Sequence, residues 1–316
     1  MAIETVAVIG AGTMGHALAL VHALGGCRVA LHDNAAQVLA RAPELIRAAL
    51  ATLQEAETLT RAKAEAAVAR ITPVDTLEEA LTIADLVVEA VVEKPEIKTL
   101  VFAAIDRHAR RGAILASNTS YLDVFPLIPD ARQARAAVAH WYTPPYIVDL
   151  VDLAPGPQTD PAVIEALRTL YTGFGKMPVV FDHLVPGYIA NRLQAALNLE
   201  CLRMIDAGWA TAQDIDRSIR HGLVDRLAVL GHMKKMDYTG LEMVRNGIAG
   251  RSYQPPENTG ETPVLDRLIA AGRTGVRAGA GFYDYGDRPA EELFHDRDLR
   301  LLRLKAQLQG NEGEDH

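Results

Sequence analysis

A glycine-rich segment near the N-terminus is the sharpest chemical signal in the sequence. It follows an apolar run at 6–9, opens a helical pattern at 14–24, and reads Gly10-Ala11-Gly12-Thr13-Met14-Gly15. In such a segment the first glycine permits a tight turn, the second lets a pyrophosphate approach the backbone, and the third lets helix and strand pack closely. The helix N-terminus then offers N–H groups and a positive dipole end to the phosphates. We therefore predict a dinucleotide site formed by Gly10, Gly12, Thr13, Met14 and Gly15.

An acidic residue after the next apolar run indicates which dinucleotide binds. Asp33 lies 18 residues after Gly15, close to the end of the run at 28–31. A carboxylate at this point accepts hydrogen bonds from a ribose 2′-hydroxyl and repels a 2′-phosphate. The sequence therefore predicts NAD as the cofactor and disfavours NADP.

The elements that must position these residues alternate along the first part of the chain. Short apolar runs bounded by turns lie at 6–9, 28–31, 86–90, 113–116, 136–139, 147–153 and 178–181. Helical patterns separate them, which is typical of parallel strands covered by helices on both faces. An Ala- and Arg-rich helical pattern at 36–69 exceeds the usual crossover length, so we expect one long helix that projects from the sheet as an arm.

The second part of the chain is helical. Helical patterns lie at 188–207, 214–221, 241–248, 262–271 and 289–308, and only 282–285 resembles a strand. This change of pattern predicts two domains with a boundary near 183–186. The expected fold is an α/β Rossmann-type doubly wound sheet at 1–184, which binds NAD, followed by an all-α C-terminal domain at 185–316.

Composition excludes several classes of protein. The net charge of −8 argues against a nucleic acid or an anionic membrane as the main partner, and no apolar stretch is long enough to span a bilayer. Cys27 and Cys201 cannot form a disulfide framework and, without a secretory signal, are expected as reduced thiols in a cytoplasmic protein. The histidines lack metal-ligand spacing, so no metal site is expected.

Several further motifs occur in series and make the chain resemble the L-3-hydroxyacyl-CoA dehydrogenase family. They are Glu89-Ala90-Val91-Val92-Glu93 with Lys98, Ala116-Ser117-Asn118-Thr119-Ser120, His140-Trp141-Tyr142-Thr143-Pro144, Val185-Pro186-Gly187-Tyr188-Ile189-Ala190-Asn191-Arg192 and Gly279-Ala280-Gly281-Phe282-Tyr283. The resemblance implies an NAD-dependent oxidoreductase of fatty acid metabolism that interconverts a 3-hydroxyacyl-CoA ester and its 3-oxo form. It also implies a cleft between the two domains and a homodimer formed by the helical domain.

The resemblance assigns the proton chemistry to His140 and Asp152. His140 occupies the position of the family's His, and the family's Glu falls on Asp152, twelve residues later. Imidazole can reversibly take a hydroxyl proton as hydride leaves the carbon. His140 is expected just after the strand at 136–139, where such sheets bind ligands. Asp152 could fix the imidazole tautomer although Asp is one methylene shorter than Glu, and Asp149 is a rival for this role.

Two polar residues match family positions that contact the substrate oxygen and the nicotinamide region. These are Ser120 and Asn191, and both can donate hydrogen bonds to charge on the reacting oxygen. Ser120 could instead cap a helix that begins near Asp123. Asn191 is expected inside a helix, where Asn is mildly unfavourable, and this favours a special role.

Three charged residues match positions near the cofactor. Glu93 and Lys98 correspond to cofactor-contacting residues, although they could also be a solvent-exposed pair flanking a helix start. Arg277 falls where the family often has Lys near the cofactor. All three are therefore predicted to contact NAD.

The stretch at 48–57 departs from the family pattern and leaves two classes of substrate open. It holds no Ser and no Lys, where the family has CoA contacts, but it does hold Glu55 and Glu57, which would repel CoA phosphates. Arg41, Arg47 and Arg61 could reach the phosphates instead. The alternative substrate is therefore a free 3-hydroxy acid, or a compound like carnitine or L-gulonate, whose dehydrogenases share the helical tail at 289–308. A non-catalytic NAD-binding relative is a further alternative, which the retained site residues oppose.

Overall fold

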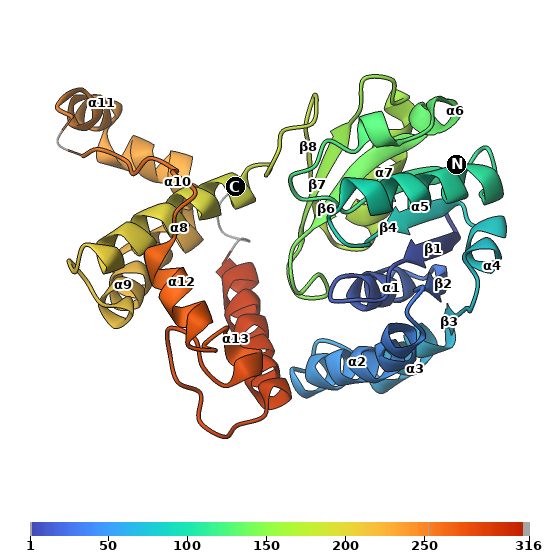
Figure 1. Cartoon of the computed structure of the whole chain (residues 1–316), viewed down its shortest axis with the longest axis horizontal. Coiled ribbons are helices and arrows are strands. Elements are labelled where there is room, and N and C mark those ends of the chain that lie inside the picture. The colour runs from blue at the N-terminus through green and yellow to red at the C-terminus, as the bar shows by residue number, and fades with distance from the viewer. Residues whose placement is uncertain (1, 252, 312–316) are drawn as a thin grey trace. The chain divides into compact units, whose positions relative to one another are not determined.

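The chain folds into two compact units. The computed structural model describes residues 2–251 and 253–311, and it divides into Met1–Tyr188 and Ile189–His316 (Figure 1). The predicted boundary at 183–186 lies just before this division. The first unit contains a sheet covered by helices, and the second is built from helices, so the predicted fold class is confirmed.

Eight strands form one sheet in the first unit, in the order β3-β2-β1-β4-β5-β6-β7-β8. Their bounds are β1 Thr5–Ile9, β2 Arg28–His32, β3 Ile71–Pro73, β4 Leu86–Glu89, β5 Ile114–Ser117, β6 Ala136–Trp141, β7 Leu150–Pro155 and β8 Met177–Val180. β3 is an edge strand that the apolar runs did not indicate, because two of its three residues are exposed.

One strand departs from the expectation of a parallel sheet. β7 runs antiparallel to β6, while every other neighbouring pair is parallel. The chain between β6 and β7 holds no helix, and without a crossover a strand returns antiparallel to its neighbour. β7 also begins later than predicted, since residues 147–149 precede it.

Alternate residues of the strands feed two apolar clusters, one on each face of the sheet. In β1, Val6 and Val8 belong to one cluster, whereas Ala7 and Ile9 belong to the other. Every residue of β1, β4, β5 and β6 is buried, as expected for strands with both faces covered. Residues of α1 (Gly15–Leu24) and α7 (Pro161–Gly173) fill the first cluster, and residues of α4 (Leu77–Thr82) and α5 (Pro95–His108) fill the second.

The prediction of one projecting helix at 36–69 is wrong. The segment forms two helices, α2 (Ala36–Glu55) and α3 (Arg61–Ala69), which lie side by side in Figure 1 and contact each other and α1. Glu57 has a left-handed backbone with φ of 57°, and the Thr60 hydroxyl accepts from the Lys63 amide to cap α3. Apolar residues of both helices are buried in the first cluster, including Leu39, Ile46 and Ala67. The helical pair is therefore part of the core.

The second unit contains six α-helices in its described residues. They are α8 (Ala190–Asp206), α9 (Ala212–Ser218), α10 (Asp225–Thr239), α11 (Leu241–Ala249), α12 (Pro263–Ala270) and α13 (Ala290–Asn311). The sequence did not indicate α10, which carries little amphipathic pattern and is kinked at Gly231, where φ is 68°. The segment at 282–285 is not a strand and makes only an isolated bridge from Ala280 to Asp284.

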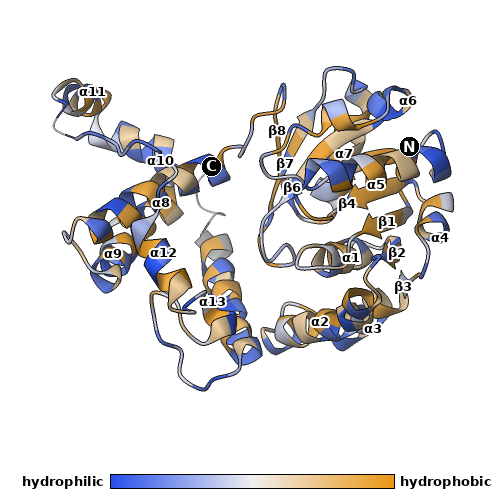
Figure 2. Ribbon diagram, in the orientation of Figure 1, coloured by the Kyte–Doolittle hydropathy of each residue, from blue (hydrophilic) through white to orange (hydrophobic). Residues whose placement is uncertain are grey.

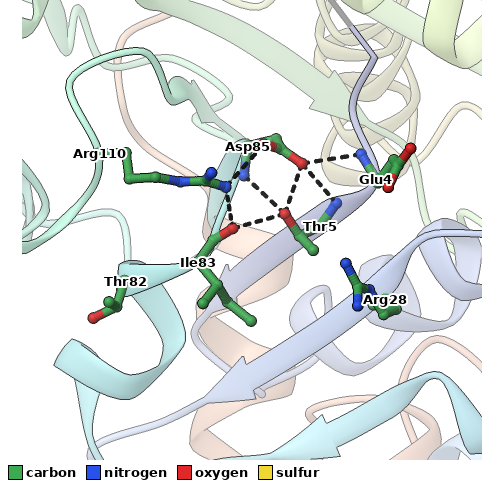
Figure 3. A pocket seen from close by; sticks show the side chains of 7 residues that line it. All are labelled: Glu4, Thr5, Arg28, Thr82, Ile83, Asp85 and Arg110. Carbon is green, nitrogen blue, oxygen red and sulfur yellow. Dashed lines mark hydrogen bonds and ion pairs between the residues drawn. The ribbon is translucent and has the colours of Figure 1, made fainter.

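A pocket of about 390 Å³ lies at the amino ends of the strands (Figure 3). Thr5 begins β1, Arg28 begins β2, and Asp85 directly precedes β4. Asp85 accepts bonds from the backbone of Glu4 and Thr5 and from the Thr5 hydroxyl, and it pairs with Arg110 at 2.9 Å. Because ligands of such sheets bind at the carboxyl ends, this network is structural and the site is sought at the opposite edge.

Candidate active site

The glycine loop connects β1 to α1 at the carboxyl edge of the sheet. Gly10 has φ of 98°, and a Cβ there would lie 2.6 Å from the Ala90 carbonyl oxygen. A Cβ on Gly15 would meet the Gly10 oxygen at 1.6 Å, so helix and strand can pack only with glycine there. A Cβ on Gly12, in contrast, would have no atom within 4 Å, and Thr13 is exposed. No side chain caps α1, so the loop offers open backbone at a helix N-terminus and fits a pyrophosphate.

Asp33 is held beside this loop. One carboxylate oxygen accepts from the Ala11 backbone amide at 2.7 Å, and the other accepts from the Ala35 amide at 2.9 Å. The side chain is half-buried, and each oxygen can accept a further bond. A fixed, ionisable acceptor next to a phosphate-binding loop is the chemistry that a ribose hydroxyl requires. The geometry therefore fits NAD.

His140 and Asp152 face each other across the antiparallel pair of strands. They are register partners in β6 and β7, and His140 Nδ1 lies 3.4 Å from Asp152 Oδ2. His140 is 3% exposed and Asp152 is 1% exposed. The sequence predicts His140 just after the strand, but the strand continues to Trp141, so His140 lies inside β6. This direct pairing brings the backbones close enough for the shorter carboxylate to reach the imidazole.

Asp149 has a different environment. Its side chain lies 3.4 Å from Nζ of Lys176, which also donates to the carbonyl oxygens of Pro145 and Val148. Asp149 precedes β7, and Lys176 is buried. This arrangement ties the loop before β7 to the start of β8.

Ser120 lies on the other side of the imidazole. Its Oγ is 3.2 Å from Nε2 of His140, so Ser120, His140 and Asp152 form a continuous chain of polar contacts. Ser120 is not a helix cap, since the next helical turn, Phe125–Leu127, has Val124 at its N-cap. The Asp123 carboxylate accepts from the Phe125 amide in this turn.

Glu93 orders the loop that carries Ser120. Its Oε1 accepts from the Thr119 hydroxyl at 2.6 Å and from the Ser120 amide at 2.9 Å. Partial burial disfavours the ionised form, but these bonds, the Tyr121 amide and the Lys98 charge outweigh it and lower the pKa of Glu93. Glu93 therefore stays ionised and fixes the Ser120 backbone.

Lys98 is not the solvent-exposed partner that one interpretation of the sequence allowed. It is 1% exposed, and Nζ lies 2.7 Å from Glu89 and 3.3 Å from Glu93. Glu89 was missed as a site residue. It is fully buried at the end of β4, where it also accepts from the Ser117 hydroxyl at 2.5 Å. It opens one of the family motifs, and it is an acid inside an apolar run, which is expensive to bury without a partner.

Two tyrosines beside His140 were also missed. The Tyr142 hydroxyl donates to Asp152 Oδ2 at 2.6 Å, and its ring meets the imidazole edge-on at 4.7 Å. The Tyr188 ring stacks on the imidazole at 4.6 Å, and its hydroxyl donates to the Thr119 carbonyl at 2.7 Å. Tyr142 directly follows β6, so strand alternation does not identify it, and its contact with Asp152 is known only from the structure.

Two predicted site residues belong to the second unit. Asn191 is half-buried in the first turn of α8. Asn is better tolerated in a first turn than in a helix interior, which weakens the argument from helix propensity. Arg277 is exposed, and its guanidinium lies 5.1 Å from the centre of the Phe294 ring. The roles of both residues stay predictions of the sequence motifs.

Two further features are absent from the part of the chain that the structure describes. No group of three or more His, Cys, Asp or Glu side chains is placed to hold a metal ion there. Among the helices of 2–251 and 253–311, none combines the length and apolar character needed to cross a bilayer.

The doubly wound sheet with this glycine loop defines the class of protein, an NAD-dependent dehydrogenase that acts on a CH–OH group. Residues 5–184 match the family model for the NAD binding domain of 3-hydroxyacyl-CoA dehydrogenase, and residues 187–285 match the model for its C-terminal domain. The chain therefore belongs to the 3-hydroxyacyl-CoA dehydrogenase family.

Relatives in this family have different substrates. The chain is 34% identical to L-carnitine dehydrogenase of Streptomyces griseus, over 84% of this chain and 80% of the relative. It is 31% identical to mitochondrial hydroxyacyl-coenzyme A dehydrogenase of Homo sapiens, over 90% and 91%. The solved structure of 5-formyl-3-hydroxy-2-methylpyridine 4-carboxylic acid 5-dehydrogenase, described as an NAD+-dependent dismutase, superposes with a TM-score of 0.87 at 28% identity and covers 98% of this chain and 99% of its own.

Proposed function

We propose that the protein oxidises a CH–OH group of a small free hydroxy acid, with His140 as the general base. The observation that carries the proposal is the continuous chain from Ser120 through His140 to Asp152, which lies on the same sheet as the glycine loop. An imidazole with one nitrogen facing a hydroxyl and the other facing a carboxylate is suited to moving one proton reversibly.

Each residue of the chain has one task in this mechanism. His140 Nε2 takes the proton of the substrate hydroxyl, and Ser120 Oγ donates to the reacting oxygen. Asp152 holds the Nδ1 proton and stabilises the imidazolium that forms. NAD, when bound by the glycine loop and Asp33, supplies the hydride acceptor. In the reverse direction the same imidazolium returns its proton to the oxygen of the carbonyl substrate.

Two findings support a free acid over a CoA ester. The chain matches the pyridine carboxylate dehydrogenase over almost its whole length, including the region after residue 285 that lies beyond the family models. In addition, α2 ends at Glu55 and is followed by Glu57, whose charges oppose binding of CoA phosphates. The names of that relative and of L-carnitine dehydrogenase describe small substrates that carry no CoA.

A CoA ester is the second candidate, and one feature favours it. A pocket of about 560 Å³ between α2 and α3 is lined by Arg47 and Arg61 together with the apolar Leu50 and Val68. Arg61 already pairs with Glu65 at 2.8 Å, and this pair weakens the attraction of Arg61 for a bound phosphate. The arginines are the feature that would let this surface hold a phosphorylated tail.

A kinetic comparison separates the two candidates. We would measure kcat/KM with NADH for acetoacetate and acetoacetyl-CoA, screen free 3-hydroxy acids and L-carnitine with NAD, and add free CoA as an inhibitor. The free-acid proposal expects turnover of a free acid at least equal to that of the ester, with weak inhibition by CoA. Strong inhibition by CoA, with KM for the ester raised about tenfold by Arg47→Ala but not by Lys63→Ala, would establish the ester instead.

The role of Asp152 is tested against its neighbour. Asp152→Asn keeps the shape of the side chain but removes the charge that stabilises the imidazolium, so kcat should fall by about 10²-fold with little change in KM. Asp149→Asn should do much less, because Asp149 contacts Lys176. The reverse order of effects would assign the partner role to Asp149.

We also propose that the helical unit forms a homodimer with a second copy of the chain. Helices α8, α10 and α11 have no buried residue among those described, and they expose large apolar side chains. These include Leu193, Met233, Tyr238, Met243 and Ile248, each more than half exposed. Apolar surface on this scale is typical of an interface.

A further inference from the structure

We propose that Tyr142 is a positioning residue, whose hydroxyl aims the Asp152 carboxylate at His140. The proposal rests on the proposed function, in which His140 moves the substrate proton. It adds a fourth member to the chain of Ser120, His140 and Asp152, and it assigns that member a measurable effect on the reaction.

The distances show which contact fixes the carboxylate. The Tyr142 hydroxyl donates to Asp152 Oδ2 at 2.6 Å, whereas His140 Nδ1 lies 3.4 Å from the same oxygen. Hydrogen bonds from a hydroxyl to a carboxylate are strong at the shorter distance, and the longer one is near the limit for an N–H donor. The carboxylate is therefore held by the tyrosine and presented to the imidazole.

Burial makes this one donor important. Asp152 is 1% exposed, and its other oxygen, Oδ1, is buried without a hydrogen-bond partner among the described residues. An ionised carboxylate removed from water requires donors to remain charged. Without the Tyr142 hydroxyl, the side chain of Asp152 would depend on the long contact with His140.

Tyr142 directly follows the last residue of β6. Its ring meets the imidazole of His140 at 84°, with ring centres 4.7 Å apart. Tyr188 stacks on the imidazole at 23°, which fixes the ring plane. The two tyrosines thus restrict rotation of the imidazole, while the Tyr142 hydroxyl restricts rotation of the carboxylate.

Other polar groups near the pair are already bound to partners. Ser120 contacts Nε2 of His140, and the Tyr188 hydroxyl donates to the Thr119 carbonyl. Glu93 is the nearby acid, and Lys98 pairs with it. On the far side of β7, Asp152 has Val179 of β8 as its register partner, which brings no charge. The Tyr142 hydroxyl is therefore the donor through which the interaction between Asp152 and His140 can be altered.

The effect on the pH dependence of oxidation has a definite sign. In the proposed mechanism the imidazole of His140 accepts the substrate proton, and the Asp152 carboxylate stabilises the imidazolium that forms. The Tyr142 hydroxyl draws part of the carboxylate charge into its own hydrogen bond. Loss of this donor leaves the carboxylate to stabilise the imidazolium more strongly, and this shifts the pH profile of oxidation upward. Oxidation would then require a higher pH.

Tyr142→Phe is the direct test because it removes only the hydroxyl. The pH profile of kcat for oxidation should shift upward by about one pH unit, the size expected for one lost bond to a charged group, and kcat at neutral pH should fall about tenfold with little change in KM. Tyr171→Phe is the matched control. It removes the hydroxyl of a fully buried tyrosine that packs against Trp141, and it should leave the profile unchanged.

A double-mutant cycle shows whether Tyr142 acts through Asp152. In an Asp152→Asn background the added Tyr142→Phe change should alter neither kcat nor the pH profile, because the carboxylate it serves is absent. Equal effects of Tyr142→Phe in both backgrounds would overturn the proposal, as would a wild-type pH profile in the single variant. NADH binding and circular dichroism of each variant confirm that it is folded.

The outcome also separates this proposal from the proposed function. If His140→Ala retains nearly full turnover, the proposed mechanism itself fails. If His140→Ala loses turnover while Tyr142→Phe keeps the wild-type pH profile, the mechanism stands and only the positioning role of Tyr142 is rejected.

Discussion

The two units of the chain bury their apolar residues very differently. In the first unit, strands β1, β4, β5 and β6 are buried along their whole length, and helices complete a core on each face of the sheet. In the second unit, α8, α10 and α11 expose apolar side chains, and Figure 2 shows hydrophobic residues along these helices. The sheet of the first unit therefore has its apolar core within that unit, whereas three helices of the second unit have no buried residue among those described.

This difference separates the chemistry from the association. His140 and Asp152, which must be held to a fraction of an ångström, lie on buried strands, and Ser120 lies on a loop that Glu93 orders. Exposed apolar helices gain stability by burying their surface against another molecule. The proposed functions of the units follow this division, and each of the predictions below tests one side of it.

The largest effect is expected at the centre of the first unit. His140→Ala should lower kcat for oxidation by roughly 10²–10⁴-fold, because the base that takes the hydroxyl proton is lost. NADH binding, measured by fluorescence, should stay within a few-fold of wild type, since the glycine loop and Asp33 are unchanged. A variant that oxidises substrate at nearly the wild-type rate would remove His140 from the mechanism.

The next-largest effect is expected at the exposed apolar surface of the second unit. Light scattering should give about twice the chain mass of 34.2 kDa. Ile248→Asp places a charge on a side chain that is 75% exposed on α11, and it should weaken the proposed dimer by about 10²-fold because the charge would be desolvated in the interface.

Leu100→Asp is the control for this test. Leu100 is 69% exposed on α5 of the first unit, so the same change there should leave the mass unchanged. A monomeric wild-type protein at micromolar concentration would contradict the proposed dimer. Dissociation caused by Leu100→Asp alone would place the interface on the first unit.

The sequence was sufficient for the parts of the fold that depend on local signals. The glycine loop, the apolar strands and the change to a helical second part all come from short-range patterns, and the structure confirms them. The antiparallel β7 and the division of 36–69 into two helices were not predicted. The helix-free connection before β7 and the Thr60 cap of α3 are local features, but hydrophobic periodicity encodes neither of them.

The polar partners of the site were the hardest part to predict. His140 and Asp152 could be named from motifs, but their direct pairing comes from the register of two strands. The contacts of Glu89 and Tyr142 are known only once burial and distance are known, because neither the acid in β4 nor the tyrosine after β6 has a local signature of its partner. Sequence patterns thus predict which residues take part more readily than which atoms they contact.

A third prediction concerns His22, which lies in the core of the first unit. His22 is fully buried, and this desolvation lowers its pKa from 6.5 to about 4, although its Nδ1 bonds to the Leu18 carbonyl at 2.8 Å. The unfolded chain therefore binds a proton between about pH 6.5 and pH 4 that the folded chain does not. The contribution of His22 to stability is complete above pH 6.5, and it decreases as the pH falls through this window.

Urea denaturation at several pH values measures this contribution. The free energy of unfolding should fall by up to about 1.4 kcal/mol per pH unit across the window because of His22. His22→Leu removes the titrating group and keeps an apolar side chain in the core, so its stability should depend less on pH by that amount. Equal slopes for the two proteins would show that His22 does not control acid stability.

The smallest effect is expected at the edge of the first unit, where Asp33 meets the glycine loop. The intact protein should have a higher kcat/KM with NAD than with NADP, because the carboxylate accepts from ribose hydroxyls and repels a 2′-phosphate. Asp33→Ala should weaken binding of NAD by about tenfold, the value of one hydrogen bond to a charged group, and it should reduce the preference for NAD over NADP.

The Ala11 and Ala35 amides also lose their acceptor in Asp33→Ala, so a loosened loop is a second cause of weaker binding. Asp33→Asn distinguishes these causes, since its amide oxygen can still accept from one backbone amide while the repulsive charge is gone. If charge sets the preference, Asp33→Asn should gain activity with NADP. Equal kcat/KM for the two cofactors in the intact protein would show that Asp33 does not select between them.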